Sequence, residues 1–297
     1  MIFEEYAIQP DVLNTKENCR FWLSLMGLEK GRQISRYPKR WKRLVYDSLI
    51  NCKPREKKYV EDRLFNLPNN VLKKRIHNWD PNPTVGWIKN AVAEHNRNPF
   101  HAIIAKENPD KSKKVLIANE EDDTHELLIA NPNRSIIRDL NGITGWVKQL
   151  LEQSNLIVFI DPFFSPSNGD YLIVLKRFTE IIISSIPNGS NKKIQFHSRN
   201  TIGGTKNHFI NECTKKIKPM TEDGLEIAFY RWPDNEIHNR FILTDSHGGV
   251  SYNYGLGIGS PNHDMNDEIN YLSEDAYQKR WDQYVKTDKK PVCIISK

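Results

Sequence analysis

The segment of residues 237–255 holds the side chains best suited to chemistry on a phosphate group. Three of its residues have the spacing H-x-R-x4-D, and two more follow in the spacing S-x-N: His238, Arg240, Asp245, Ser251 and Asn253. An imidazole can attack phosphorus or protonate a leaving oxygen, while a cation and small hydroxyl or amide donors stabilise charge on the non-bridging oxygens. The pattern therefore predicts a phosphodiester site. On a strand, His238 and Arg240 would share one face, and Asp245 could orient an imidazole of a symmetry-related or neighbouring site.

Two predicted strand ends carry further candidate residues. Asp161 follows the apolar run 156–160, which is typical of a strand buried on both faces, and ligands of open α/β sheets gather beyond the carboxyl ends of such strands. His197 and Arg199 form a second H-x-R pair at the end of another predicted strand. These three residues are predicted to bind substrate. The alternatives are a turn cap for Asp161 and a plain strand end for the pair. For His238 and Arg240 the alternative is a surface cluster with salt bridges to Asp234, Glu236 or Asp245.

The H-x-R-x4-D pattern with its trailing G-x-S-x-N resembles one half of the H-x-K-x4-D…G-S-x-N signature of the phospholipase D superfamily. The resemblance covers a little over half of the chain and implies a phospholipase-D-like α/β sandwich. It implies that His238 is the nucleophile or acid, that Arg240 takes the place of the family's lysine, and that Asp245 matches its aspartate. Ser251 and Asn253 match the trailing pair.

The sequence departs from that family in two ways. Arg240 replaces a lysine, so a planar fork stands where the family has a point charge. The full-length enzymes of the family also carry two motifs, whereas the nearest second match here, at His197, has Gly204 at the aspartate position.

Two functions are compatible with a single motif. The first is a metal-independent nuclease or phosphodiesterase acting as a homodimer in which each copy supplies one His238, as the resemblance to small single-motif nucleases implies. The second is a catalytically silent module that recognises phosphate groups of nucleic acid or phospholipid, similar to the phospholipase-D-like C-terminal domain of MIT-domain proteins. The stretch HNRFILTD followed by GGVS is also similar to an uncharacterised bacterial group found in defence-like contexts. That similarity implies partner proteins and a sensor or accessory role in prokaryotic antiviral defence.

Basic residues are concentrated near the N-terminus. Residues 30–75 contain 15 Lys or Arg against 4 Asp or Glu, a local charge of +11, so the rest of the chain carries 6 − 11 = −5. The densest run is interleaved with Tyr37 and Trp41, and its cations are predicted to bind nucleic acid: Arg36, Lys39, Arg40, Lys42 and Arg43. A solvated helix face and an acidic phospholipid surface are the alternatives. The run favours a nuclease over a lipase.

The elements that must position these residues divide the chain into two predicted domains within the α/β class. Residues 1–125 are predicted to form a basic, mainly helical region of about four helices, with a β-hairpin formed by 100–105 and 114–118. Residues 126–297 are predicted to form the phospholipase-D-like α/β domain, with helices over 134–153, 171–185 and 207–217. Its predicted strands are 156–160, 193–197, 225–230 and 241–244, with 249–254 as the hairpin partner of the last. Aromatic side chains at helical spacing predict a docking helix near the C-terminus: Tyr277, Trp281 and Tyr284.

Composition limits the class of protein. The chain has 297 residues with 38% hydrophobic and 27% charged residues, which is polar but compatible with a folded core. No apolar run approaches the roughly 18 residues of a spanning helix, and the first residues lack the pattern of a signal peptide, so a soluble, cytoplasmic protein is expected. Four scattered cysteines predict neither a disulfide framework nor structural zinc. The glycine-containing stretches 203–206 and 255–259 match no phosphate-loop motif, so no cofactor and no metal are predicted.

Overall fold

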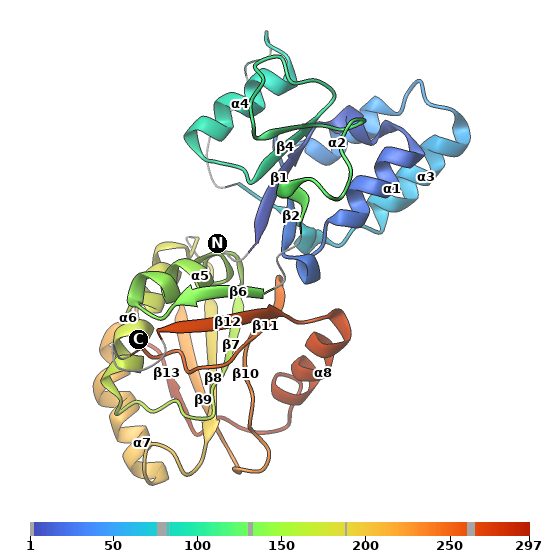
Figure 1. The fold of residues 1–297 in the computed structure, drawn as a ribbon. Coiled ribbons are helices and arrows are strands. Elements are labelled where there is room, and N and C mark those ends of the chain that lie inside the picture. The colour runs from blue at the N-terminus through green and yellow to red at the C-terminus, as the bar shows by residue number, and fades with distance from the viewer. Residues whose placement is uncertain (1–2, 76–81, 83, 130–132, 188, 260–264) are drawn as a thin grey trace. The chain divides into compact units, whose positions relative to one another are not determined.

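The computed structural model describes the chain except for residues 1–2, 76–81, 83, 130–132, 188 and 260–264 (Figure 1). The chain divides into two compact units, an N-terminal unit of Phe3–Asn131 and a C-terminal unit that contains Pro132–Lys297. This division lies close to the domain boundary predicted between residues 125 and 126. Each unit is built on its own β-sheet.

The N-terminal unit contains a five-stranded, wholly parallel sheet in the order β3-β2-β1-β4-β5. Its strands are β1 (Glu4–Ile8), β2 (Arg32–Ser35), β3 (Leu72–Lys73), β4 (Ala102–Ala105) and β5 (Val115–Ile117). Its α-helices are α1 (Lys16–Leu25), α2 (Trp41–Ser48), α3 (Pro54–Phe65) and α4 (Trp87–Arg97). Helices α1 to α3 pack on one face of the sheet and α4 packs on the other (Figure 1).

The helices predicted for this unit are confirmed, but the predicted β-hairpin is wrong and the parallel sheet was not predicted. Strands β4 and β5 run parallel, with Ile103 opposite Val115, so the segment between them returns the chain to the same end of the sheet. The turn expected there does exist, because the backbone N–H of Lys111 donates to the carbonyl of Asn108 (3.2 Å). The runs AIIA and VLI are strands of a sheet covered on both faces, where apolar residues follow one another without alternation.

Strands β1 and β2 are hard to recognise in the sequence because each contains a charged residue that is buried in the structure. Glu5 of β1 is 2% exposed, and its carboxylate accepts from Lys73 Nζ (2.8 Å) and from Arg75 Nε (2.7 Å). Burial raises the pKa of Glu5, but the two cations outweigh it and leave the pKa below its ordinary value. Arg32 of β2 is equally buried and donates to the carbonyls of Leu25 (3.3 Å) and Leu128. Partners distant in the chain thus allow charged residues to occupy core strands.

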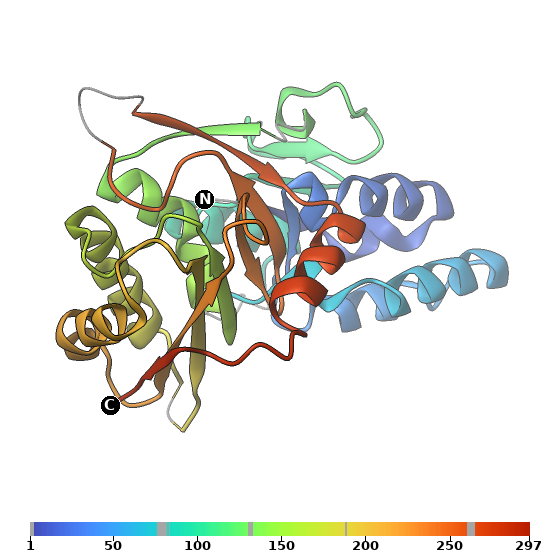
Figure 2. The same ribbon diagram turned by 90° about the horizontal axis from the view of Figure 1, so that it is seen from below.

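The C-terminal unit contains an eight-stranded mixed sheet. In spatial order its strands are β13 (Cys293–Ile295), β9 (Leu225–Trp232), β8 (Lys192–Arg199), β7 (Leu156–Ile160), β10 (Arg240–Thr244), β11 (Gly248–Tyr252), β12 (Asn266–Tyr271) and β6 (Asn133–Ile137). Its α-helices are α5 (Leu140–Gln153), α6 (Gly169–Ser184), α7 (Lys206–Glu212) and α8 (Glu274–Tyr284). Helices α5 to α7 cover one face and α8 covers the other (Figures 1 and 2).

Most elements predicted for this unit are confirmed, including the buried strand at 156–160 and the antiparallel pair β10 and β11. One predicted helix is wrong in its first part. The segment 134–153 begins with β6, and α5 starts only after Asp139, whose side chain accepts from the backbone N–H of Gly142 (2.6 Å). The predicted aromatic helix near the C-terminus is confirmed as α8, which follows β12. The α/β class is confirmed, and the likeness to a phospholipase-D sandwich stays a prediction.

Strand register gathers several strand ends at one edge of this sheet. Strand β10 is antiparallel to β7, with Phe241 opposite Ile160, and β7 is parallel to β8, with Ile160 opposite His197. The start of β10 therefore lies beside the carboxyl ends of β7, β8 and β11. We call this side the carboxyl edge of the C-terminal sheet. Separately, none of the helices in the described ranges is long and apolar enough to cross a membrane.

Candidate functional site

A cleft with a volume of about 400 Å³ opens at the carboxyl edge of the C-terminal sheet. It is lined by His238, Asn239, Arg240, Phe241, Ser251, Tyr252, Asn253 and Arg280. Four of the five residues predicted from the H-x-R-x4-D and S-x-N spacings are therefore brought together. The pairing of β10 with β11 explains this, because Arg240 lies opposite Tyr252.

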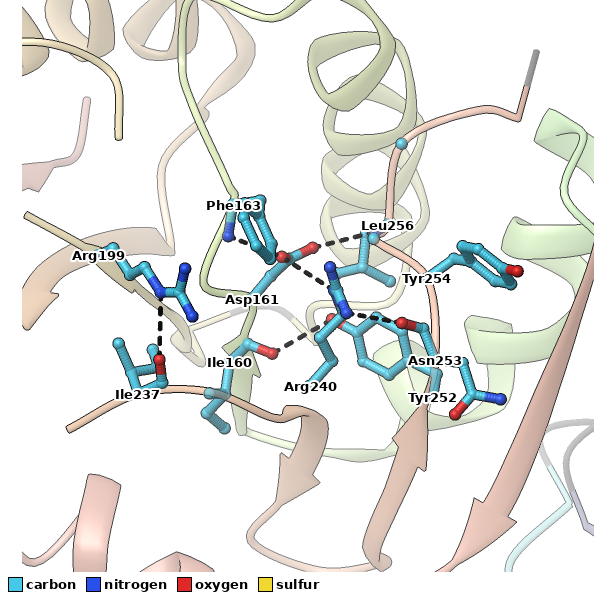
Figure 3. A network of polar contacts seen from close by, with 12 residues as sticks. Ile160, Asp161, Phe163, Arg199, Ile237, Arg240, Tyr252, Asn253, Tyr254 and Leu256 are labelled. Atoms are coloured by element: carbon cyan, nitrogen blue, oxygen red, sulfur yellow. Dashed lines mark hydrogen bonds and ion pairs between the residues drawn. The ribbon is translucent and has the colours of Figure 1, made fainter. Parts of the chain in front are cut away.

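Arg240 is the first residue of β10 and is held by three neighbours (Figure 3). Its Nη1 donates to the carbonyl of Asn253 (2.6 Å), and its Nε lies 3.5 Å from Oδ1 of Asp161. The guanidinium carbon is 4.9 Å from the ring centroid of Phe163. These contacts fix the plane of the guanidinium at the mouth of the cleft.

Asp161 is fully buried directly after β7. Its Oδ1 accepts from the backbone N–H of Phe163 (3.0 Å), and its Oδ2 accepts from that of Leu256 (3.1 Å). Burial, followed by the charge and hydrogen bond of Asp161, raises the pKa of Tyr171 far above its ordinary value, so that phenol stays protonated. Asp161 thus acts both as a turn cap and as the counter-ion of Arg240.

His238 lies in the turn before β10 rather than on a strand as predicted, and it is exposed. Its Nε2 is 3.1 Å from the carbonyl oxygen of Asn235. A carbonyl can only accept a hydrogen bond, so Nε2 carries the proton in this arrangement. In the neutral ring, Nδ1 then carries the free lone pair and can accept a hydrogen bond or act as a nucleophile.

Arg280 was not predicted from the sequence. It lies on α8, where its Nη1 donates to Oε1 of Gln283 (2.9 Å) and its guanidinium carbon is 5.0 Å from the ring centroid of Phe241. The sequence does hold a signal for Arg280. It lies three residues after Tyr277, so the spacing that predicted α8 places both side chains on the same face of the helix. A second guanidinium therefore lines the cleft.

His197 does not line the cleft. It is fully buried in β8, where its Nδ1 accepts from Nε1 of Trp232 (2.9 Å) and its ring stacks on Tyr230 with centroids 4.5 Å apart. Burial, with a smaller contribution from the charge of Lys289, lowers the pKa of His197 to about 3. The side chain is a neutral core imidazole with satisfied partners.

Two more predicted residues, Arg199 and Asp245, do not line the cleft. Arg199 ends β8, and its Nε donates to the carbonyl of Ile237 (3.3 Å), in the turn that carries His238. Asp245 follows the opposite end of β10, where its Oδ1 accepts from the backbone N–H of Asn155 (3.1 Å). Five residues of extended chain separate it from Arg240, a span on the order of 15 Å. The structure therefore places Asp245 in a turn outside the cleft.

The predicted nucleic-acid-binding run lies in the N-terminal unit, after β2 and at the start of α2. Trp41 anchors it, since its Nε1 donates to the carbonyl of Ile8 at the end of β1 (2.6 Å). Arg43 forms an ion pair with Asp47 (3.0 Å). The other four cations have no acidic partner among the described residues: Arg36, Lys39, Arg40 and Lys42. The run thus lies at the edge where the parallel strands β1 and β2 end.

The described part of the chain contains no group of three or more His, Cys, Asp or Glu side chains placed to hold a metal ion. The polar groups that line the cleft are two guanidiniums, one imidazole, two carboxamides, the hydroxyl of Ser251 and the phenol of Tyr252, whose OH donates to the carbonyl of Ile160 (3.3 Å).

No protein-family model and no curated protein matches this chain. Among solved structures it is similar to that of TrmBL2, an archaeal chromatin protein whose structure is described as showing a novel mode of DNA binding. The two are 16% identical with a TM-score of 0.31. The similarity covers 52% of this chain and 52% of the other, so it spans about half of each protein.

Proposed function

We propose that the C-terminal unit binds a phosphodiester of nucleic acid in the cleft. The convergence of Arg240, Arg280 and His238 on one opening carries the proposal. Guanidinium groups offer paired N–H donors that match two oxygens of a phosphate, and such charge-assisted hydrogen bonds are roughly twice as strong as neutral ones. Ser251 and Asn253 add uncharged donors to the lining.

The charge balance of the cleft favours an anionic ligand. Arg240 lies near one carboxylate, that of Asp161, whereas Arg280 hydrogen-bonds a neutral amide. Positive charge therefore remains at the opening. The basic run after β2 supplies a second cationic surface on the N-terminal unit, which we propose contacts the nucleic-acid backbone.

Hydrolysis is the second candidate function, and the exposed His238 favours it. Its Nδ1 could attack phosphorus, and the guanidiniums would stabilise charge on the non-bridging oxygens. The leaving oxygen then needs a proton from a second group, and water must afterwards attack the phosphohistidine, so that the P–N bond breaks and the imidazole is restored. Of the histidines in the described ranges, His238 alone lines the cleft, so a homodimer would supply that proton from the partner's His238.

Binding is expected to depend on Arg280. We expect Arg280→Gln to weaken binding of a labelled oligonucleotide by about tenfold, because one charge-assisted hydrogen bond contributes about 1.5 kcal/mol or more. Fluorescence anisotropy at fixed salt measures this. Arg177→Gln is the matched control, since it removes the same charge from α6, where Arg177 pairs with Glu180 (3.0 Å). If both variants bound the oligonucleotide with equal affinity, the proposal that the cleft binds the phosphodiester would be wrong.

Catalysis is tested by the fate of the same oligonucleotides with and without EDTA. We expect His238→Ala to abolish any cleavage by the wild-type chain while it retains binding, because the guanidiniums remain. Cleavage that survives in His238→Ala would refute the second candidate function. If both proteins bind but neither cleaves, the catalytically silent binding module is the function that remains. If the chain instead prefers vesicles of phosphatidic acid, its ligand is a phospholipid rather than nucleic acid.

The basic run is expected to act through charge alone. Lys39→Ala combined with Arg40→Ala should make the slope of log affinity against log salt concentration less steep by about 1.5, since each neutralised phosphate contributes about 0.7 to 0.9. The control is Arg55→Ala combined with Lys58→Ala, which removes two exposed charges from α3. An unchanged slope in the first pair would show that the run is a solvated surface.

A further inference from the structure

Two exposed aromatic rings flank the cleft. Of the exposed large hydrophobic side chains in the described ranges, three are aromatic: Phe65, Phe163 and Tyr254. Phe65 lies on α3 of the N-terminal unit, whereas Phe163 and Tyr254 are each 41% exposed at the carboxyl edge of the C-terminal sheet. Single exposed apolar side chains are ordinary on protein surfaces, so these two rings are of interest only because both lie beside the cationic opening.

Phe163 is held between two arginines. Its backbone N–H is fixed by Asp161, and its ring centroid lies 4.8 Å from the guanidinium carbon of Arg199 and 4.9 Å from that of Arg240. In Figure 3 the two guanidiniums lie on either side of Phe163. The ring thus continues the surface of the cleft towards the carboxyl end of β8.

Tyr254 stands on the other side of Arg240 in the same view (Figure 3). It follows Asn253, and its backbone N–H donates to Oδ2 of the buried Asp267 (3.0 Å). Its ring centroid is 4.9 Å from the guanidinium carbon of Arg138. Arg138 is itself fixed, because it donates to the carbonyls of Gly255 (3.2 Å) and Gly257 (3.1 Å). Both rings are therefore carried by anchored backbone.

We infer that the cleft takes single-stranded rather than duplex nucleic acid, an inference that rests on the proposed phosphodiester-binding function. Single-strand binding surfaces combine a positive groove for the backbone with aromatic side chains on which bases stack. In a duplex the base faces are covered by their neighbours, so rings beside a phosphate have nothing to stack on. The exposed parts of Phe163 and Tyr254, with the guanidinium of Arg240 between the two rings, provide that combination for a strand whose phosphate occupies the cleft.

The test compares three probes of equal length on the full chain: labelled oligothymidylate, an abasic strand with the same phosphates, and a duplex. We expect the wild type to bind oligothymidylate at least tenfold tighter than the other two. Phe163→Leu and Tyr254→Leu should each weaken oligothymidylate binding by about tenfold and leave abasic binding and its salt slope unchanged. Phe163→Tyr should retain affinity, and Phe65→Leu serves as the control for loss of an exposed ring.

The outcomes separate this inference from the function on which it rests. Equal binding of all three probes, still weakened by Arg280→Gln, would overturn single-strand selectivity and leave the phosphodiester cleft standing. Binding of no probe would overturn both. A Phe163→Leu effect on the abasic strand as large as on oligothymidylate would also overturn the inference, because the ring would then act only by positioning Arg199 and Arg240.

Discussion

Replacing Asp161 with alanine is expected to destabilise the C-terminal unit by about 3 to 5 kcal/mol. The carboxylate is fully buried and accepts from two backbone N–H groups, those of Phe163 and Leu256, while it neutralises Arg240 at 3.5 Å. Alanine would leave both N–H donors without an acceptor and the guanidinium without its counter-ion. Each loss costs about 1 to 3 kcal/mol for a buried donor, and more for a charge.

Hydrogen exchange of the β7 and β10 amides in native conditions would measure this loss, because it reports on the C-terminal unit by itself. Asp161→Asn keeps one acceptor oxygen and should lose about half as much stability. Asp223→Ala is the control, since Asp223 is exposed in a turn and its removal is expected to change stability by less than about 0.5 kcal/mol. An effect of Asp161→Ala as small as that of the control would mean that Asp161 does not hold the site together.

Part of this site could be predicted from the sequence because its residues lie close together along the chain. His238 and Arg240 are neighbours across one turn, and Ser251 and Asn253 return beside them through the tight connection between β10 and β11. The spacing of these four residues in the sequence is therefore enough to group them in one site. Asp245, which has the family spacing, lies at the far end of the same strand, so the motif does not define the cleft by itself.

The missing parts come from elements that are distant in sequence. Arg280 reaches the cleft only because α8 packs on the face of the sheet that carries Phe241. Phe163 becomes significant only once β7, β8 and β10 are adjacent, which places it beside Arg199 and Arg240. Tertiary packing decides these contacts, and no local pattern encodes it.

The N-terminal sheet was missed for a related reason. Strand β1 begins with two glutamates, which argue against a buried strand until Lys73 and Arg75 are known to surround Glu5. Short parallel strands also lack the alternation that identifies a half-exposed strand. The four helices of this unit were predictable, because their apolar residues recur at helical spacing.

Acid is expected to destabilise the C-terminal unit through His197. Burial holds the pKa of this imidazole at about 3, against an ordinary value of 6.5. As the pH falls below about 6.5, His197 binds a proton in the unfolded chain but stays neutral in the folded chain. The stability present at neutral pH is therefore progressively lost. The loss approaches 1.4 kcal/mol per pH unit and reaches on the order of 4 kcal/mol near pH 3.

Two substitutions separate the titration of His197 from its packing. His197→Gln keeps an acceptor for Nε1 of Trp232 and cannot titrate, so the difference in stability from wild type should shrink steadily as the pH falls from about 7 to 4. His197→Phe keeps the stacking on Tyr230 but leaves the indole N–H unpaired, which should add a constant cost of about 1 to 3 kcal/mol to the same pH profile. Denaturant unfolding of the three proteins across that range measures the profiles. If wild type and His197→Gln lost stability in parallel as the pH fell, the imidazole would accept its proton in the folded state. His197 would then again be a candidate for the chemistry of the cleft.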